Sequence, residues 1–127
     1  MKKQVILSNQ APAPIGPYSQ AIKAGQFLFV SGQIPLDPVS GELVSGDIAR
    51  ETQQVMQNIA AILNAAGSGW EQVVKTTIFL TNMGDFAAVN EVYATYFSAD
   101  FPARETVAVA GLPKGVRVEI SVTVLCP

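Results

Sequence analysis

The sequence predicts an α+β fold in which two helices pack on one face of a single sheet. Apolar residues recur at three- and four-residue steps between residues 48 and 66, which is the spacing of an amphipathic helix. Residues 116–124 alternate apolar and polar side chains, as a half-buried strand does. The elements follow the order strands, helix, strand, helix, strand, strand. A chain of 127 residues is expected to form one domain that spans residues 1–127.

Short strands and a proline-rich loop precede the first helix. Residues 5–7 are an apolar strand candidate, and residues 10–17 hold three prolines and a glycine, which favours an ordered loop. Residues 21–32 predict a hairpin. That hairpin ends in two small residues, Ser31 and Gly32.

The first helix is predicted over residues 48–66. Asp47 offers an N-cap side chain, and Gly67 ends the helix. The apolar stripe is expected to face the sheet. The polar residues expected on the other faces are Arg50, Glu51, Gln54 and Asn58.

The second half of the chain places a helix between strands. Residues 73–80 are rich in β-branched side chains and predict a strand. Residues 81–85 form a capped turn into a second helix, which starts near Phe86 and is closed by residues 100–102. Residues 104–109 predict the strand before the last one.

Charged residues are scarce in this chain. Eight basic residues against ten acidic ones give a net charge of −2, and only 14% of the chain is charged while 49% is hydrophobic. Typical domains are about 25% charged, so we expect some outer surface to be buried against other copies of the chain. No run of like charges suggests a nucleic-acid-binding face.

Histidine is absent, and Cys126 is the only cysteine. These counts exclude the usual zinc ligand sets and the Ser-His or Cys-His dyads, so no metal site is predicted. One cysteine cannot form an internal disulfide, and a reducing cytoplasm is the expected location. No apolar run reaches the length of a signal-peptide core or a membrane span, so a soluble protein without a membrane partner is expected. No glycine-rich motif supports nucleotide binding.

Arg104 is the best candidate among the basic residues for holding a carboxylate. It follows Pro102, opens a predicted strand and has small or apolar neighbours, so its planar cation needs an anion. The alternative is a structural salt bridge to Glu105 or Asp100. Pleating places Arg104 and Thr106 on one face of the strand and Glu105 on the other, which weakens the pairing with Glu105.

Glu119 lies in the last predicted strand, where its neighbours Val118 and Ile120 are expected to be buried. Its carboxylate then projects from the opposite face, together with Arg117, Ser121 and Thr123. A solvated strand residue is the simpler interpretation. If subunits pack against that face, Glu119 becomes a partly buried carboxylate with a raised pKa, suited to moving protons to and from water.

Other positions have a structural and a functional interpretation. Tyr18, after the proline-rich loop, belongs to the core or stacks on a flat ligand. Ser31 and Gly32 form a turn, or the glycine lets a ligand approach the backbone closely. Asn90 alone indicates solvated helix surface, and Cys126 an inert thiol.

Four segments in a fixed order carry a resemblance to a known family. They are residues 13–21 (APIGPYSQA), 29–35 (FVSGQIP), 85–93 (DFAAVNEVY) and 101–104 (FPAR), the last followed by Leu112-Pro113 and by residues 118–120 (VEI). Together they resemble the reactive intermediate deaminase family, called RidA or YjgF, over nearly the whole chain.

The resemblance implies a chorismate-mutase-like α+β fold, assembled as a homotrimer with ligand pockets between subunits. It also implies hydrolysis of 2-imino acids or their enamine tautomers, such as 2-aminoacrylate and 2-iminobutanoate, to 2-oxo acids and ammonia, without a cofactor. By the same resemblance Arg104 is the carboxylate clamp and Glu119 orders and activates water. The rest of the implied pocket is Tyr18, Ser31, Gly32, Asn90 and Thr106.

The chain departs from the family pattern beside the clamp. Thr106 stands where many relatives have cysteine, so no thiol nucleophile is available there. Glu105 replaces the serine common after the arginine, and Ala110-Gly111 occupies a stretch where a second arginine is common. Both changes bear on pocket polarity and substrate preference.

Three functions stay open on the sequence alone. The first is the imine deaminase that the resemblance implies. The second is a trimer that senses a 2-oxo acid or another small carboxylate without turnover. The third, RNA cleavage or translational inhibition, has been proposed for family members, and the acidic net charge argues against it.

Overall fold

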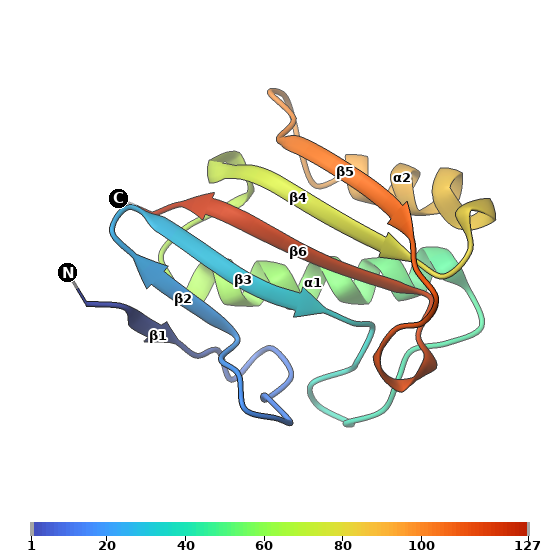
Figure 1. The fold of residues 1–127 in the computed structure, drawn as a ribbon, viewed down its shortest axis with the longest axis horizontal. Helices are drawn as coiled ribbons and strands as arrows, with labels where there is room; N and C mark the ends of the chain where they lie inside the picture. Colours follow the sequence, from blue (N-terminus) through green and yellow to red (C-terminus); the bar gives the residue numbers. More distant parts are fainter. Residues whose placement is uncertain (1, 127) are drawn as a thin grey trace.

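Residues 2–126, which the computed structural model describes, form a mixed six-stranded sheet with two helices on one of its faces (Figure 1). The spatial order of the strands is β1, β2, β3, β6, β4, β5. Their bounds are β1 Gln4–Ile6, β2 Ala21–Ala24, β3 Phe27–Gln33, β4 Val73–Leu80, β5 Ala103–Ala108 and β6 Val118–Leu125.

The two helices cover the same side of the sheet. They are α1, Ile48–Ala65, and α2, Phe86–Ala94. α1 packs against β3 and β6 in the middle of the sheet and against α2. β4 and β5 are parallel neighbours that α2 joins, and the other neighbouring strands pair antiparallel. The predicted α+β arrangement with both helices on one face is confirmed.

α1 is the amphipathic helix that the apolar spacing predicts. Asp47 caps it, because its carboxylate accepts a hydrogen bond from the Ala49 backbone N–H at 3.0 Å. The inner stripe is removed from solvent, and burial of such side chains is the main source of helix stability in a domain. The buried residues of this stripe are Thr52, Val55, Met56, Ile59, Ile62 and Leu63.

Two polar residues of α1 are buried, although the sequence predicted them on outer faces. Glu51 is 3% exposed and forms an ion pair with Arg117. Asn58 is 1% exposed, and its amide donates hydrogen bonds to the carbonyls of Ile34 at 3.1 Å and Leu36 at 2.9 Å. Their partners come from segments far away in sequence, which helical spacing does not reveal.

β6 shows the predicted alternation. Its apolar side chains Val118, Ile120, Val122 and Val124 are buried under the helices. Glu119 therefore lies on the opposite face. The prediction that Arg117 shares that face is wrong, because Arg117 precedes the strand and its Nε donates to the Glu51 carboxylate at 3.2 Å. This ion pair connects the residue before β6 to the first turn of α1.

The sheet face that the helices leave free is called the open face below. Several large apolar side chains lie on it and are between 41% and 59% exposed. They come from both edges and from the middle strands of the sheet: Val5, Phe27, Phe29, Val107 and Leu125. An uncovered apolar face of this kind is typical of a surface that packs against another protein molecule.

Candidate functional site

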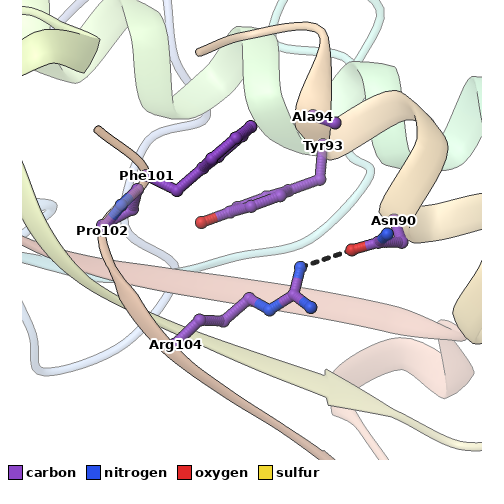
Figure 2. Close-up of a pocket in the computed structure, with 6 residues that line it drawn as sticks. All are labelled: Asn90, Tyr93, Ala94, Phe101, Pro102 and Arg104. Atoms are coloured by element: carbon purple, nitrogen blue, oxygen red, sulfur yellow. Dashed lines mark hydrogen bonds between the residues drawn. The ribbon is translucent and has the colours of Figure 1, made fainter. Parts of the chain in front are cut away.

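Arg104 lies on β5 with its guanidinium held from the side of α2 (Figure 2). Its Nη1 donates a hydrogen bond to Asn90 Oδ1 at 2.6 Å. Its Cζ lies 5.1 Å from the centre of the Tyr93 ring and 5.6 Å from that of Phe86, within the range of cation–π attraction. All three partners belong to α2.

Arg104 makes no ion pair among residues 2–126. Glu105, one of its two predicted structural partners, points to the open face, where it pairs with Lys75 at 3.1 Å and accepts a hydrogen bond from Thr77. These bonds lower the pKa of the Glu105 carboxyl. Asp100, the other predicted partner, forms no ion pair within the described chain. The guanidinium therefore keeps donors free for an external anion.

A cavity of about 410 Å³ adjoins the guanidinium. Its wall is polar at Arg104 and Asn90 and apolar elsewhere, and Figure 2 shows the aromatic and proline side chains gathered on the apolar side. The remaining lining residues are Tyr93, Ala94, Phe101 and Pro102. A small molecule with a carboxylate at one end and an apolar group at the other matches this division.

Glu119 lies on the open face beside Gly32. A Cβ atom built on Gly32 would lie 2.7 Å from Glu119 Cδ and 3.0 Å from Cγ, so only glycine leaves room for this carboxylate. The register of β3 against β6 shifts between Val30 and Gln33, which marks a β-bulge at this point. Burial raises the pKa of the Glu119 carboxyl.

Ser31 and Tyr18 lie next to Gly32. The Ser31 hydroxyl donates to the Ser19 carbonyl at 2.6 Å, which fastens β3 to the segment that carries Tyr18. Tyr18 is half exposed and lines two adjacent hollows, one shared with Ser31 and one shared with Gly32. Glu119, Gly32, Ser31 and Tyr18 are called the glutamate group below.

Gln20 holds the proline-rich loop in place, and sequence reasoning did not single it out. Its Oε1 accepts a hydrogen bond from the Ser8 backbone N–H at 2.6 Å. Its Nε2 donates to the carbonyls of Ser8 at 3.1 Å and Pro12 at 2.8 Å. Gln20 is buried, and its burial is what marks it as a structural residue. Burial is not visible in a single sequence, so the sequence offered no signal for this role.

Arg104 and Glu119 point to opposite faces of the sheet. β4 lies between their strands, and its Thr76 pairs with Arg104 while its Phe79 pairs with Glu119. Side chains alternate along a strand, so positions three residues apart point to opposite sides. Within one chain the structure brings Arg104 together with Asn90, and brings the glutamate group together, but it does not join the two sets.

Thr106 shares the face of Arg104 but does not line the cavity. Its hydroxyl is buried and has no hydrogen-bond partner within residues 2–126. Leaving a buried hydroxyl without a partner costs about 1–3 kcal/mol.

Thr106→Val is therefore expected to raise the free energy of unfolding by about 1 kcal/mol, because it removes that hydroxyl and keeps the shape of the side chain. Chemical denaturation measures the change. The matched control is Thr77→Val, which removes a hydroxyl that donates to Glu105 and is expected to give no gain. A loss of stability in Thr106→Val would contradict the finding that the Thr106 hydroxyl has no hydrogen-bond partner within residues 2–126.

Two further structural findings bear on the chemistry. Within residues 2–126, no three His, Cys, Asp or Glu side chains lie close enough to hold a metal ion. In the same part of the chain, no helix has the length and apolar character needed to cross a membrane.

Comparison with known proteins gives consistent matches over nearly the full length. The family model described as Endoribonuclease L-PSP matches residues 8–126. A RutC family protein of Pyrococcus horikoshii is 58% identical over 118 residues, which cover 93% of this chain and 94% of that protein. A Mus musculus protein named 2-iminobutanoate/2-iminopropanoate deaminase is 50% identical over 118 residues, which cover 93% of this chain and 87% of that protein.

A solved structure agrees as well. The crystal structure of E. coli TdcF with bound serine matches with a TM-score of 0.92 and 39% identity, and the match covers 96% of this chain and 98% of that one.

Proposed function

Because the chain belongs to the YjgF/RidA family, which the Endoribonuclease L-PSP model describes, we propose that it hydrolyses 2-imino acids and their enamine tautomers to 2-oxo acids and ammonia. The substrate class we propose includes 2-aminoacrylate and 2-iminobutanoate. Relatives at about 50% identity are named imine deaminases, which supports this reaction. We propose that the reaction takes place in the cytoplasm and needs no cofactor.

The guanidinium of Arg104, which forms no ion pair within the described part of the chain, is the observation that carries the proposal. It is the part of the cavity wall that can form two parallel hydrogen bonds with a carboxylate. Every 2-imino acid and every 2-oxo acid presents such a carboxylate. The serine bound in E. coli TdcF is an amino acid with the same group, which supports a ligand of this kind.

We propose that the complete site forms between two copies of the chain in a homotrimer. The pair Arg104–Asn90 lies on one face of the sheet, and the glutamate group lies on the other. One chain alone therefore does not offer the pair and the glutamate group to the same small molecule. The apolar open face supports assembly, because its exposed aromatic and aliphatic side chains lose contact with water when copies pack together.

In the proposed mechanism, Arg104 of one chain holds the substrate carboxylate and Glu119 of the neighbouring chain places a water near C2. Glu119 accepts a proton from the water as its oxygen attacks C2 of the protonated imine and the C=N π electrons move to nitrogen, which gives a neutral carbinolamine. Glu119 then returns this proton to the carbinolamine nitrogen. Ammonia leaves as the C=O bond forms, and the hydroxyl proton passes to Glu119 and from there to solvent. Imine and water are thereby converted to 2-oxo acid and ammonia. A partly buried carboxylate with a raised pKa suits this proton exchange.

Gly32→Ala is expected to lower kcat/KM by about tenfold or more, because the new methyl group occupies the place of the Glu119 carboxylate and displaces it. We expect this variant to keep its fold. Circular dichroism and thermal melting would detect a global effect on the fold. Gly111→Ala is the matched control, because a Cβ at that position meets no atom within 4 Å. Equal activity of both variants would contradict the role proposed for Glu119.

The experiment that tests the function generates imines enzymatically from several amino acids and follows their disappearance. An amino-acid oxidase or dehydratase supplies the imine, and semicarbazide traps whatever is not hydrolysed. We expect the protein to accelerate hydrolysis well beyond the spontaneous rate, and Arg104→Ala to abolish most of that acceleration. No acceleration by the wild-type protein would overturn the proposal.

The other functions predict different results in simple measurements. A 2-oxo acid sensor would bind 2-oxobutanoate tightly in calorimetry and leave imine hydrolysis unchanged. A ribonuclease, which the name of the family model suggests, would bind RNA with an affinity that falls steeply with salt. The net charge of −2 and the few basic residues argue against the latter.

A further inference from the structure

We infer that Tyr93 is a positioning residue, which fixes the plane of the Arg104 guanidinium through the face of its ring. This inference rests on the proposed function of Arg104 as the carboxylate clamp. Tyr93 is part of the cavity wall and lies against the guanidinium (Figure 2).

The geometry forms a closed set of three contacts. The Tyr93 hydroxyl donates a hydrogen bond to Thr76 Oγ1 at 3.1 Å. Thr76 on β4 is the residue that pairs with Arg104 in the sheet. The guanidinium of Arg104 in turn lies 5.1 Å from the centre of the Tyr93 ring. The residue beside Arg104 in the sheet therefore tethers the ring that supports Arg104.

The Tyr93 ring is itself fixed. It is buried and packs against Phe97, with 4.9 Å between the ring centres. Burial raises the pKa of its hydroxyl, so the group remains protonated and able to donate to Thr76 at neutral pH. A ring held by packing and by a hydrogen bond presents its face in one orientation.

The clamp needs such a support because Arg104 is exposed and has a long side chain. Holding an arginine side chain in one conformation costs rotamer entropy. Asn90 binds only one guanidinium nitrogen, which leaves rotation about that contact. The ring face restricts this rotation without using any of the remaining N–H donors. Those donors stay available for a carboxylate.

A residue that only fills the core would support the fold but would not affect the guanidinium. The two roles separate in a spectroscopic readout, because protons over an aromatic face are shifted by its ring current. The chain has three arginines, Arg50, Arg104 and Arg117, so three side-chain Nε–Hε signals are expected in a ¹⁵N correlation spectrum. Arg104→Lys identifies the signal of Arg104.

The experiment compares Tyr93→Met with Tyr93→Phe. Methionine fills the site without an aromatic face, whereas phenylalanine keeps the ring and loses only the hydroxyl. We expect Tyr93→Met to move the Arg104 Hε signal toward the position of the exposed Arg50. We also expect it to weaken binding of 2-oxobutanoate, and to raise KM for the imine, by about tenfold, with kcat changed less. Tyr93→Phe should keep the ring-current shift and most of the affinity.

An unshifted Arg104 signal in the wild-type protein would overturn the inference even if Tyr93→Met does not fold. Wild-type 2-oxobutanoate affinity in a folded Tyr93→Met variant would overturn it as well. Failure of the proposed function can be distinguished from failure of this inference. If the proposed function fails, the wild-type protein does not hydrolyse imines, but the Arg104 signal still shows whether Tyr93 lies against the guanidinium. If imines are hydrolysed and Tyr93→Met equals the wild type in KM, the function stands and the positioning role fails.

Discussion

Glu119→Gln is expected to lower kcat by about 10²- to 10⁴-fold, which is the contribution typical of a positioned general acid–base group. Glutamine has nearly the same shape and can still hold a water by hydrogen bonds. It cannot accept the proton that the water loses as its oxygen attacks C2. Steady-state kinetics with an enzymatically generated imine measures the change, and KM is expected to change little because Arg104 still binds the carboxylate.

The pH dependence provides the control for that prediction. Burial raises the pKa of Glu119, and only its ionised form accepts a proton, so wild-type activity should decline as pH falls through this raised pKa. The acidic limb should be missing from the residual activity of Glu119→Gln.

The raised pKa of Glu119 also affects the stability of the fold. The stability that this carboxyl contributes is fully present at pH values below its unfolded pKa, and it is lost as pH rises through its folded pKa. Glu119→Gln should therefore equal or exceed the wild type in stability at pH 7, and a less stable variant would contradict this assignment.

Arg104→Ala is expected to lower kcat/KM by about 10²-fold, mainly through KM. In the proposed site, the variant removes the charge-assisted hydrogen bonds from Arg104 to the substrate carboxylate, and bonds of this kind are worth about 1.5–3 kcal/mol. Arg104→Lys should recover part of the loss, because it restores the charge without the planar fork. Competition by 2-oxobutanoate should weaken in parallel in both variants.

Arg50→Ala is the matched control for the clamp, because Arg50 is an exposed arginine on α1. We expect this variant to keep the wild-type KM. If removal of either arginine had the same effect, the change would reflect the overall charge of the protein, and the clamp assigned to Arg104 would be wrong.

Periodicity made much of the fold predictable. The stripe of α1, its cap at Asp47 and the alternation of β6 are local patterns, and the structure has all three. Burial of Glu51 and Asn58 was not predictable, because each is stabilised by a partner from a distant segment. The position of Arg117 was not predictable either, because its partner Glu51 lies in a distant segment. In addition, the alternation in the sequence continues one residue beyond the strand.

For the candidate site, the sequence predicts which residues could bind a carboxylate or move a proton, but not how they are arranged in space. Pleating separates Arg104 from Glu105, and the structure shows that separation. Nothing in the sequence says which face of β5 meets the helices, so the opposite placement of Arg104 and Glu119 appears only in the structure. The support of Arg104 by Tyr93 depends on strand pairing with Thr76, which no local pattern reveals.

Mixed oligomers of Arg104→Ala and Glu119→Gln chains test most directly whether one chain supplies the arginine and its neighbour the glutamate. Each variant alone should be nearly inactive. After co-refolding in equal amounts, about a quarter of the sites in a randomly mixed trimer combine an intact Arg104 with an intact Glu119 from the adjacent chain. We expect about that fraction of wild-type activity to return. No recovery in oligomers shown to contain both chains would contradict a site shared between neighbours.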